Sequence, residues 1–159
     1  LRMSSKGTYL RKENYMKTLA FYLTALAVMF AVGSASAADL TIDMLNKDAD
    51  GNKMVYSNEL AKVEVGETIT WLPASKGHNV EWIAGPDGAD LPKKSKNGKE
   101  VSMTFEVPGI YYYWCTPHKG MGMIGLVVVG GDVSNKDTIA KAKALGKSKK
   151  KLKALLGEL

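Results

Sequence analysis

The residues best suited to metal chemistry lie in one short segment and in one motif upstream of it. The segment 115–123, CTPHKGMGM, contains Cys115, the only cysteine of the chain, and His118, one of its two histidines. The other histidine is His78, in the motif KGHNV. One thiolate, two imidazoles and a weak thioether are the donors of blue-copper sites that transfer electrons. The pattern therefore predicts a site for one copper ion that uses the cysteine and both histidines.

Two methionines could supply the thioether, and their spacing alone leaves both open. Met121 gives Cys-x2-His-x2-Met and Met123 gives Cys-x2-His-x4-Met. Met123 directly precedes the apolar run 124–129, which a strand would hold rigidly, whereas Met121 lies between two glycines. We therefore favour His78, Cys115, His118 and Met123 as the metal ligands. Asn79, next to His78, is expected to bond the thiolate or to tie the two ligand segments together.

The N-terminal region has the pattern of an export signal. Met16-Lys17-Thr18 precedes the apolar run 19–32, and an A-x-A cleavage site follows at 35–37. The run is shorter than the ~20 residues of a membrane-spanning helix. We expect translation to start at Met16, cleavage after Ala37, a periplasmic protein and no stable membrane anchor. Residues 1–37 are then an upstream extension plus the removed signal peptide.

Composition excludes several kinds of function. Residues 38–159 contain 17 lysines, no arginine and 15 acidic residues, a formal net charge of +2, which gives little support to nucleic-acid binding. A single cysteine in an oxidising compartment cannot form an internal disulfide. A Cys115–His118 nucleophile pair would need an oxyanion pocket and an orienting group, and no motif supplies them. We therefore predict no catalytic residues and no enzymatic activity.

The mature chain is mainly β in pattern. Short apolar or alternating segments, separated by Gly and Pro turns, predict a Greek-key β-sandwich over residues 38–130. The expected strands are 39–45, 54–56, 60–65, 68–72, 101–107, 110–114 and 123–129. Residues 85–98, with two prolines and an Asp-Gly pair, predict a long surface loop.

A C-terminal extension, 131–159, has a different pattern. Capping residues from Ser134 onward predict one helix to about Leu145, and 148–156 predict a second whose leucines lie on one face. The lysines of this second helix then form its solvated face while the leucines pack on the sandwich. Lys151 is expected to lie far from the metal-binding segments.

Taken together, these motifs resemble the pseudoazurins, a family of small periplasmic cupredoxins. The resemblance covers residues 38–159 and rests on MLNK at 44–47, KGHNVE at 76–81, PDGA at 86–89, and the segment 115–123. It implies a monomeric, eight-stranded cupredoxin sandwich with two short C-terminal helices, and copper bound by His78, Cys115, His118 and Met123. It also implies electron transfer to nitrite or nitrous oxide reductase, from a quinol-linked or cytochrome donor.

The partner surface is expected to be rich in lysine. Lys76 and Lys119 flank the two ligand segments, and mobile lysines suit transient electrostatic steering. The run Tyr112-Tyr113-Trp114 departs from the family pattern and is expected to alter this docking surface. A second function, copper handling as a chaperone or store, is the alternative. Such proteins favour exposed, exchangeable Met- or Cys-rich clusters, and this chain has one cysteine.

Overall fold

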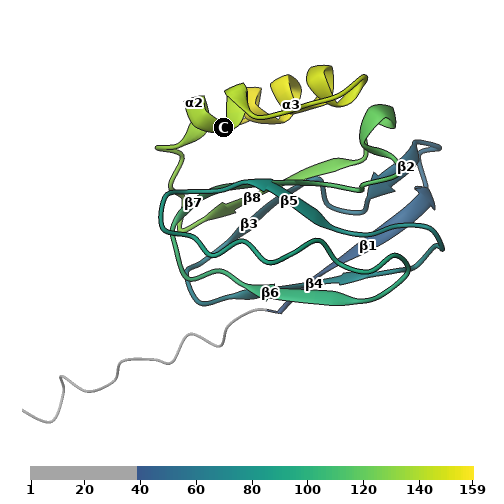
Figure 1. Cartoon of the computed structure of the whole chain (residues 1–159), viewed down its shortest axis with the longest axis horizontal. Helices are drawn as coiled ribbons and strands as arrows, with labels where there is room; N and C mark the ends of the chain where they lie inside the picture. The colour runs from purple at the N-terminus through teal and green to yellow at the C-terminus, as the bar shows by residue number, and fades with distance from the viewer. Residues whose placement is uncertain (1–38) are drawn as a thin grey trace, which may run out of the picture. The chain divides into compact units, whose positions relative to one another are not determined.

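The computed structural model describes residues 39–159, and within this range eight strands form two four-stranded sheets (Figure 1). The first sheet has the order β2 (Lys53–Tyr56), β1 (Leu40–Lys47), β4 (Thr68–Leu72) and β6 (Val101–Thr104). The second has the order β3 (Leu60–Val63), β8 (Ile124–Val129), β7 (Gly109–Trp114) and β5 (Glu81–Ala84). The predicted β-sandwich of about eight strands is confirmed.

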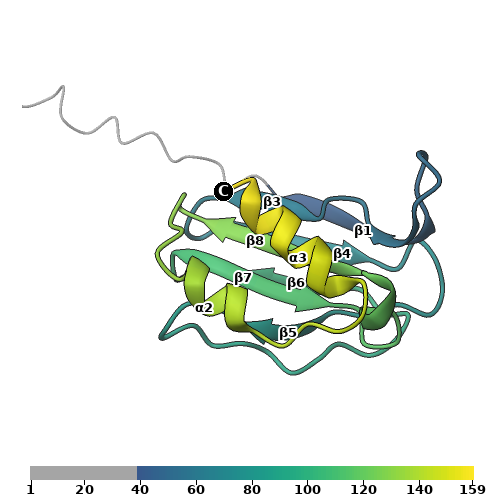
Figure 2. The same ribbon diagram turned by 90° about the horizontal axis from the view of Figure 1, so that it is seen from above.

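Helices cover the outer face of the second sheet. α2 (Lys136–Lys141) and α3 (Ser148–Gly157) lie across β7 and β8, so the molecule has three layers (Figures 1 and 2). A one-turn 3-10 helix, η1 (Lys119–Met121), lies between β7 and β8 in the chain. β1 pairs with β4 and β3 pairs with β8 in parallel, while the remaining pairs are antiparallel.

The pair β4–β6 shows how alternation sets the two faces of the first sheet. Ile69 pairs with Met103, and both side chains face the core between the sheets. On the other face, the hydroxyl groups of Thr70 and Ser102 lie 2.8 Å apart in a cross-strand hydrogen bond. Such pairs contribute a few tenths of a kcal/mol to about 1 kcal/mol each.

Strands β7 and β8 are buried along their whole length, because both faces of the second sheet are covered. Tyr111 and Tyr113 face the first sheet and pack in the inter-sheet core. Ile110, Tyr112 and Trp114 face the helices, where they meet buried side chains of α2 and α3. These helix residues are Ile139, Leu152, Leu155 and Leu156. The prediction that the leucine face of the second helix packs on the sandwich is confirmed.

Several elements differ from the sequence prediction, among them β6, which ends at Thr104 rather than at residue 107. The sequence prediction lacks β5, because its four residues, EWIA, have no polar alternation, all four are half-buried, and its pairing with β7 is irregular. α2 ends at Lys141 rather than near Leu145, because Ala142 turns to an extended conformation. Ala144 and Leu145 then pack against the core beneath the helices, so tertiary packing overrides helix propensity.

The predicted signal peptide and its cleavage site lie outside the described residues. Among residues 39–159, no helix is long and apolar enough to cross a membrane. The long loop predicted at 85–98 contains neither helix nor strand.

Candidate metal centre

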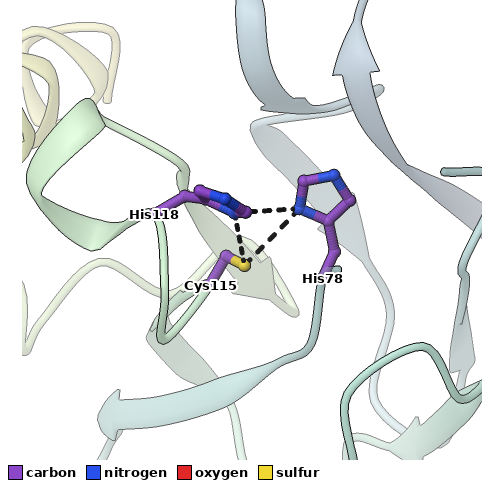
Figure 3. A group of neighbouring side chains, drawn as sticks. All are labelled: His78, Cys115 and His118. Carbon is purple, nitrogen blue, oxygen red and sulfur yellow. Dashed lines mark hydrogen bonds between the residues drawn. The ribbon is translucent and has the colours of Figure 1, made fainter. Parts of the chain in front are cut away.

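Three of the four predicted ligands converge at one end of the sandwich. Figure 3 shows the rings of His78 and His118 and the sulfur of Cys115 facing one another. The two Nδ1 atoms are 3.1 Å apart. Cys115 Sγ lies 3.6 Å from Nδ1 of His78 and 3.4 Å from Nδ1 of His118. Two nitrogens and one sulfur therefore form a nearly equilateral triangle.

The size of this triangle fits a metal ion. A point equidistant from the three atoms lies about 2 Å from each, and metal–nitrogen and metal–sulfur bonds of ~2.0–2.3 Å are typical of zinc sites with the same donors. Trigonal coordination by one cysteine and two histidines, with a weak axial ligand, is the arrangement of blue-copper sites. The donor set and its geometry thus suit a copper ion.

Main-chain hydrogen bonds position the two ligand segments. Cys115 directly follows β7, and its N–H donates to the carbonyl of Met123 (2.9 Å), which extends the β7–β8 pairing by one residue. His118 N–H donates to the carbonyl of Cys115 (3.1 Å), closing a tight turn. On the other segment, the carbonyl of His78 accepts a bond from Gly98 N–H (2.8 Å) in the long loop.

The two methionines lie in very different environments. Met123 has no exposed surface and belongs to the same inter-sheet core cluster as Cys115. Met121 is 48% exposed in η1. The hydrogen bond between Cys115 and Met123 brings the main chains of these two residues together. These positions favour Met123 over Met121 as the fourth donor.

Asn46 orients the ring of His78, a role that sequence reasoning missed. Nε2 of His78 lies 2.8 Å from Oδ1 of Asn46, which can only accept a hydrogen bond. Nε2 therefore carries the proton, and the lone pair of Nδ1 is directed toward His118 and Cys115. Ligand histidines usually have such a partner. Asn46 lies in the MLNK motif that carried the family resemblance, and this was the only signal in the sequence.

Asn79 joins the two ligand segments. This is one of the two roles that the sequence predicts for it. Its Oδ1 accepts from Thr116 N–H (2.8 Å), and its Nδ2 donates to Thr116 Oγ1 (2.9 Å). Tyr56, buried in the core, donates its hydroxyl to the carbonyl of Asn79 (2.7 Å). The residues next to His78 and Cys115 are thereby fixed relative to each other.

Glu81 extends this network to the residue on the other side of the cysteine. Its carboxylate accepts from Trp114 Nε1 (2.6 Å) and from Thr116 Oγ1 (2.7 Å). Burial acts to raise the pKa of Glu81, but these two hydrogen bonds, with the charges of Lys119 and Lys94, outweigh it and lower the pKa. Both chain neighbours of Cys115 are therefore anchored to one ionised carboxylate.

Burial sets the charge states of the candidate ligands. It lowers the pKa of His78, with a further contribution from His118, and it lowers the pKa of His118. Both imidazoles are thus favoured in the neutral form, which binds metals. Burial also raises the pKa of the Cys115 thiol, so a bound cation must favour the thiolate.

The surface around the site corrects two expectations. Tyr112 and Tyr113 are fully buried and Trp114 is 3% exposed, so this run lies in the two cores and cannot form a docking surface. The expectation that Lys151 lies far from the metal-binding segments is also wrong. A Cβ atom added at Gly122 would lie 3.7 Å from Cε of Lys151. The start of α3 packs on the loop after His118, which the helical pattern alone did not predict.

The fold and the donor set define a copper-binding cupredoxin. Residues 43–130 match the model of the copper-binding proteins of the plastocyanin/azurin family. The chain is 40% identical to the pseudoazurin of Methylorubrum extorquens over 78% of its own length and 82% of that protein's. It is 37% identical to the pseudoazurin of Paracoccus pantotrophus, over 89% and 97% of the two chains.

Solved structures agree with the sequence relatives. The native pseudoazurin of Hyphomicrobium denitrificans superposes with a TM-score of 0.70 at 38% identity, covering 77% of this chain and 98% of its own. The chain belongs to the plastocyanin/azurin family of copper-binding proteins, and within it to the pseudoazurins. It is therefore a type I copper electron-transfer protein and not an enzyme, and its function requires redox partners.

Proposed function

We propose that this protein carries single electrons in the periplasm on one type I copper ion bound by His78, Cys115, His118 and Met123. The observation that carries the proposal is the triangle of Nδ1, Nδ1 and Sγ atoms, with edges of 3.1 to 3.6 Å. A bound copper ion supplies the one-electron couple between Cu(I) and Cu(II). The protein supplies a donor set that suits both oxidation states, so the ligands need to move little.

The residues around the site have separate roles in this proposal. Asn46 holds the ring of His78, and the Asn79–Thr116 pair holds the two ligand segments together. His78, Cys115 and Met123 have no exposed surface, so the core excludes water from three of the four donors. This enclosure supports an electron carrier over a copper-handling protein, which needs a donor set that a second protein can reach.

His118 is the proposed point of electron entry and exit. It is the one candidate ligand with partial exposure, and exposed Pro117, Gly120 and Met121 are its neighbours in the loop. A partner can approach this apolar edge closely without contacting the buried donors. Lys76 is exposed beside His78 in sequence, and Lys119 lies with its Nζ 4.8 Å from the centre of the Trp114 ring.

Family membership supports a proposal for the partner and for the compartment. The pseudoazurin relatives and the signal-like segment 16–37 support export to the periplasm. We propose a reductase of denitrification, nitrite or nitrous oxide reductase, as acceptor and a quinol-linked or cytochrome donor. We further propose a monomer that docks transiently, without a membrane anchor or nucleic-acid binding.

Absorption spectroscopy of the copper-loaded protein tests this function. We expect an intense visible band from thiolate-to-Cu(II) charge transfer, one copper ion per chain, and reversible bleaching on reduction. Colourless or readily transferred copper would instead favour the copper-handling alternative.

Salt dependence tests the docking surface. If Lys76 and Lys119 steer a partner with an acidic surface, electron transfer to nitrite reductase should slow as ionic strength rises, because exposed charges are screened beyond ~10 Å at 0.1 M. Lys76→Glu should lower the association rate severalfold, with the absorption spectrum unchanged. The measurement is stopped-flow oxidation of the reduced protein across a salt series.

A matched control for this experiment is Lys62→Glu. Lys62 is exposed on β3 and pairs with Val128, near the end of β8 remote from Ile124, whereas Trp114 and Cys115 lie at the Ile124 end. Lys151 is unsuitable because it is ion-paired and close to the ligand loop. A flat salt profile, or equal slowing in Lys62→Glu and Lys76→Glu, would reject steering by this surface.

A further inference from the structure

We propose that the start of α3 holds the ligand loop 118–123 in position and thereby limits its rearrangement during electron transfer. The effect on electron transfer rests on the proposed function, whereas the positioning of the loop can be tested without copper. The helical extension would then have a role in the metal site, beyond covering the sheet.

The internal main-chain hydrogen bonds of the loop converge on one acceptor, the carbonyl of His118. It contains Gly120 and Gly122, the latter with φ of +99°, between the proposed ligands His118 and Met123. Within the loop, Met121 N–H and Met123 N–H both donate to the carbonyl of His118, at 2.9 and 3.3 Å. The carbonyls of Lys119 and Gly120 instead accept hydrogen bonds from outside the loop, from Ser148 and Lys147.

The first residue of α3 and the residue before it supply these donors. Lys147 N–H donates to the carbonyl of Gly120 (3.0 Å), and the hydroxyl of Ser148 donates to the carbonyl of Lys119. Ser148 has no exposed surface, so water cannot replace this bond easily. The N-terminal end of a helix carries partial positive charge, which favours the carbonyls of Lys119 and Gly120 beside it.

The contact between the loop and the helix is close enough to depend on glycine. A Cβ atom at Gly146 would overlap the carbonyl oxygen of Gly120, and a Cβ atom at Gly122 would lie 3.5 Å from Cβ of Lys147. Gly146 has φ of +54°, in the left-handed region that favours glycine. The main chains of the two segments thus pack directly against each other.

An ion pair links α3 to Glu59, whose main chain is hydrogen-bonded to β8, the strand that follows Met123. Nζ of Lys151 lies 2.6 Å from Oε1 of Glu59, with both side chains partly buried. The carbonyl of Glu59 accepts from Leu126 N–H of β8 (2.9 Å). The helix therefore contacts the loop at Lys119 and Gly120 and is tied to the strand that begins directly after the loop. The loop is thus held directly by the start of the helical segment, and the strand after it is linked to α3 through Glu59.

Amide hydrogen exchange of the Ser148→Ala variant tests the positioning. Losing one buried hydrogen bond should raise the exchange rates of the Met121 and Met123 amides by about fivefold in the copper-free protein. In the copper-loaded protein, the rate of electron self-exchange should fall severalfold, because the loop rearranges more between oxidation states. Lys151→Met, which keeps the aliphatic stem but removes the ion pair, should change both rates in the same directions.

Asn135→Ala is the matched control. The Asn135 side chain accepts from Ile110 N–H and donates to the carbonyl of Ile110, both at 2.9 Å, at the end of β7 remote from Cys115. This variant loosens the attachment of the helical extension without touching the ligand loop. In this variant, the amide exchange rates of Met121 and Met123 should rise only as much as the measured change in the free energy of unfolding accounts for.

The outcomes separate the two proposals. Selective loop exchange in Ser148→Ala together with slower self-exchange supports the positioning role. Equal amide exchange rates of the loop in Ser148→Ala and Asn135→Ala would overturn the positioning role. Faster amide exchange of the loop in Ser148→Ala alone, with an unchanged rate of electron self-exchange and an unchanged copper spectrum, would also overturn it. If the wild-type protein shows no blue copper site, the proposed function fails, and the copper-free exchange data still decide whether α3 positions the loop.

Discussion

Cys115→Ser is expected to abolish the visible absorption band of the copper-loaded protein. A serine hydroxyl is neither soft nor readily deprotonated, so no thiolate-to-copper charge transfer remains. His78 and His118 would still offer two nitrogen donors 3.1 Å apart, so a weakly coloured copper complex with lower affinity is the expected remnant of the site. Titration with Cu(II), followed by visible absorption and electron paramagnetic resonance, measures both effects.

The copper-free Cys115→Ser protein should remain folded. Cys115 is fully buried, and an unpaired hydroxyl in its place costs about 1–3 kcal/mol of stability. Thermal unfolding of copper-free wild type and variant provides this control. An intense blue band in a folded Cys115→Ser variant would contradict the assignment of the cysteine as ligand.

Met123→Leu is expected to keep the blue band and to raise the reduction potential by at least ~60 mV, which corresponds to a tenfold change in relative affinity for the two oxidation states. Loss of the axial thioether disfavours Cu(II) more than Cu(I). Leucine has nearly the same volume as methionine and suits the fully buried position. Protein-film voltammetry measures the potential.

Met121→Leu is the matched control for this experiment. Met121 is 48% exposed, so its replacement should leave the potential close to that of the wild type. The opposite result, a large shift in Met121→Leu and a small one in Met123→Leu, would assign the axial position to Met121. The shorter Cys-x2-His-x2-Met spacing would then apply to this chain.

Much of the site could be predicted because its donors are rare residue types. One cysteine and two histidines leave few combinations, and Cys115 and His118 are only three residues apart. Alternation predicts a strand at 101–107, and the Pro-Gly turn leads to a second at 110–114; the structure has strands at Val101–Thr104 and Gly109–Trp114. The copper cofactor, the sandwich fold and the absence of enzymatic function are confirmed by the family.

The remaining features depend on contacts between segments distant in sequence. Asn46 orients His78 from 32 residues away, and nothing in the local pattern of Asn46 marks it as a partner of a histidine. The half-buried strand β5 has no hydrophobic period to detect. Lys151 was placed on a remote helix because helical periodicity predicts which face is buried but not which loop the helix end contacts.

The placement of β7 and β8 between two apolar layers has a consequence for the smallest chain that can fold. Ile110, Tyr112 and Trp114, with Ile124, Leu126 and Val128 beside them, face α2 and α3 rather than water. A chain shortened to end at Gly130 would present this apolar surface to solvent, and exposed patches of this kind promote aggregation. We therefore expect the C-terminal helices to keep the sandwich soluble, although the change in composition after Gly130 suggests a separable appendage.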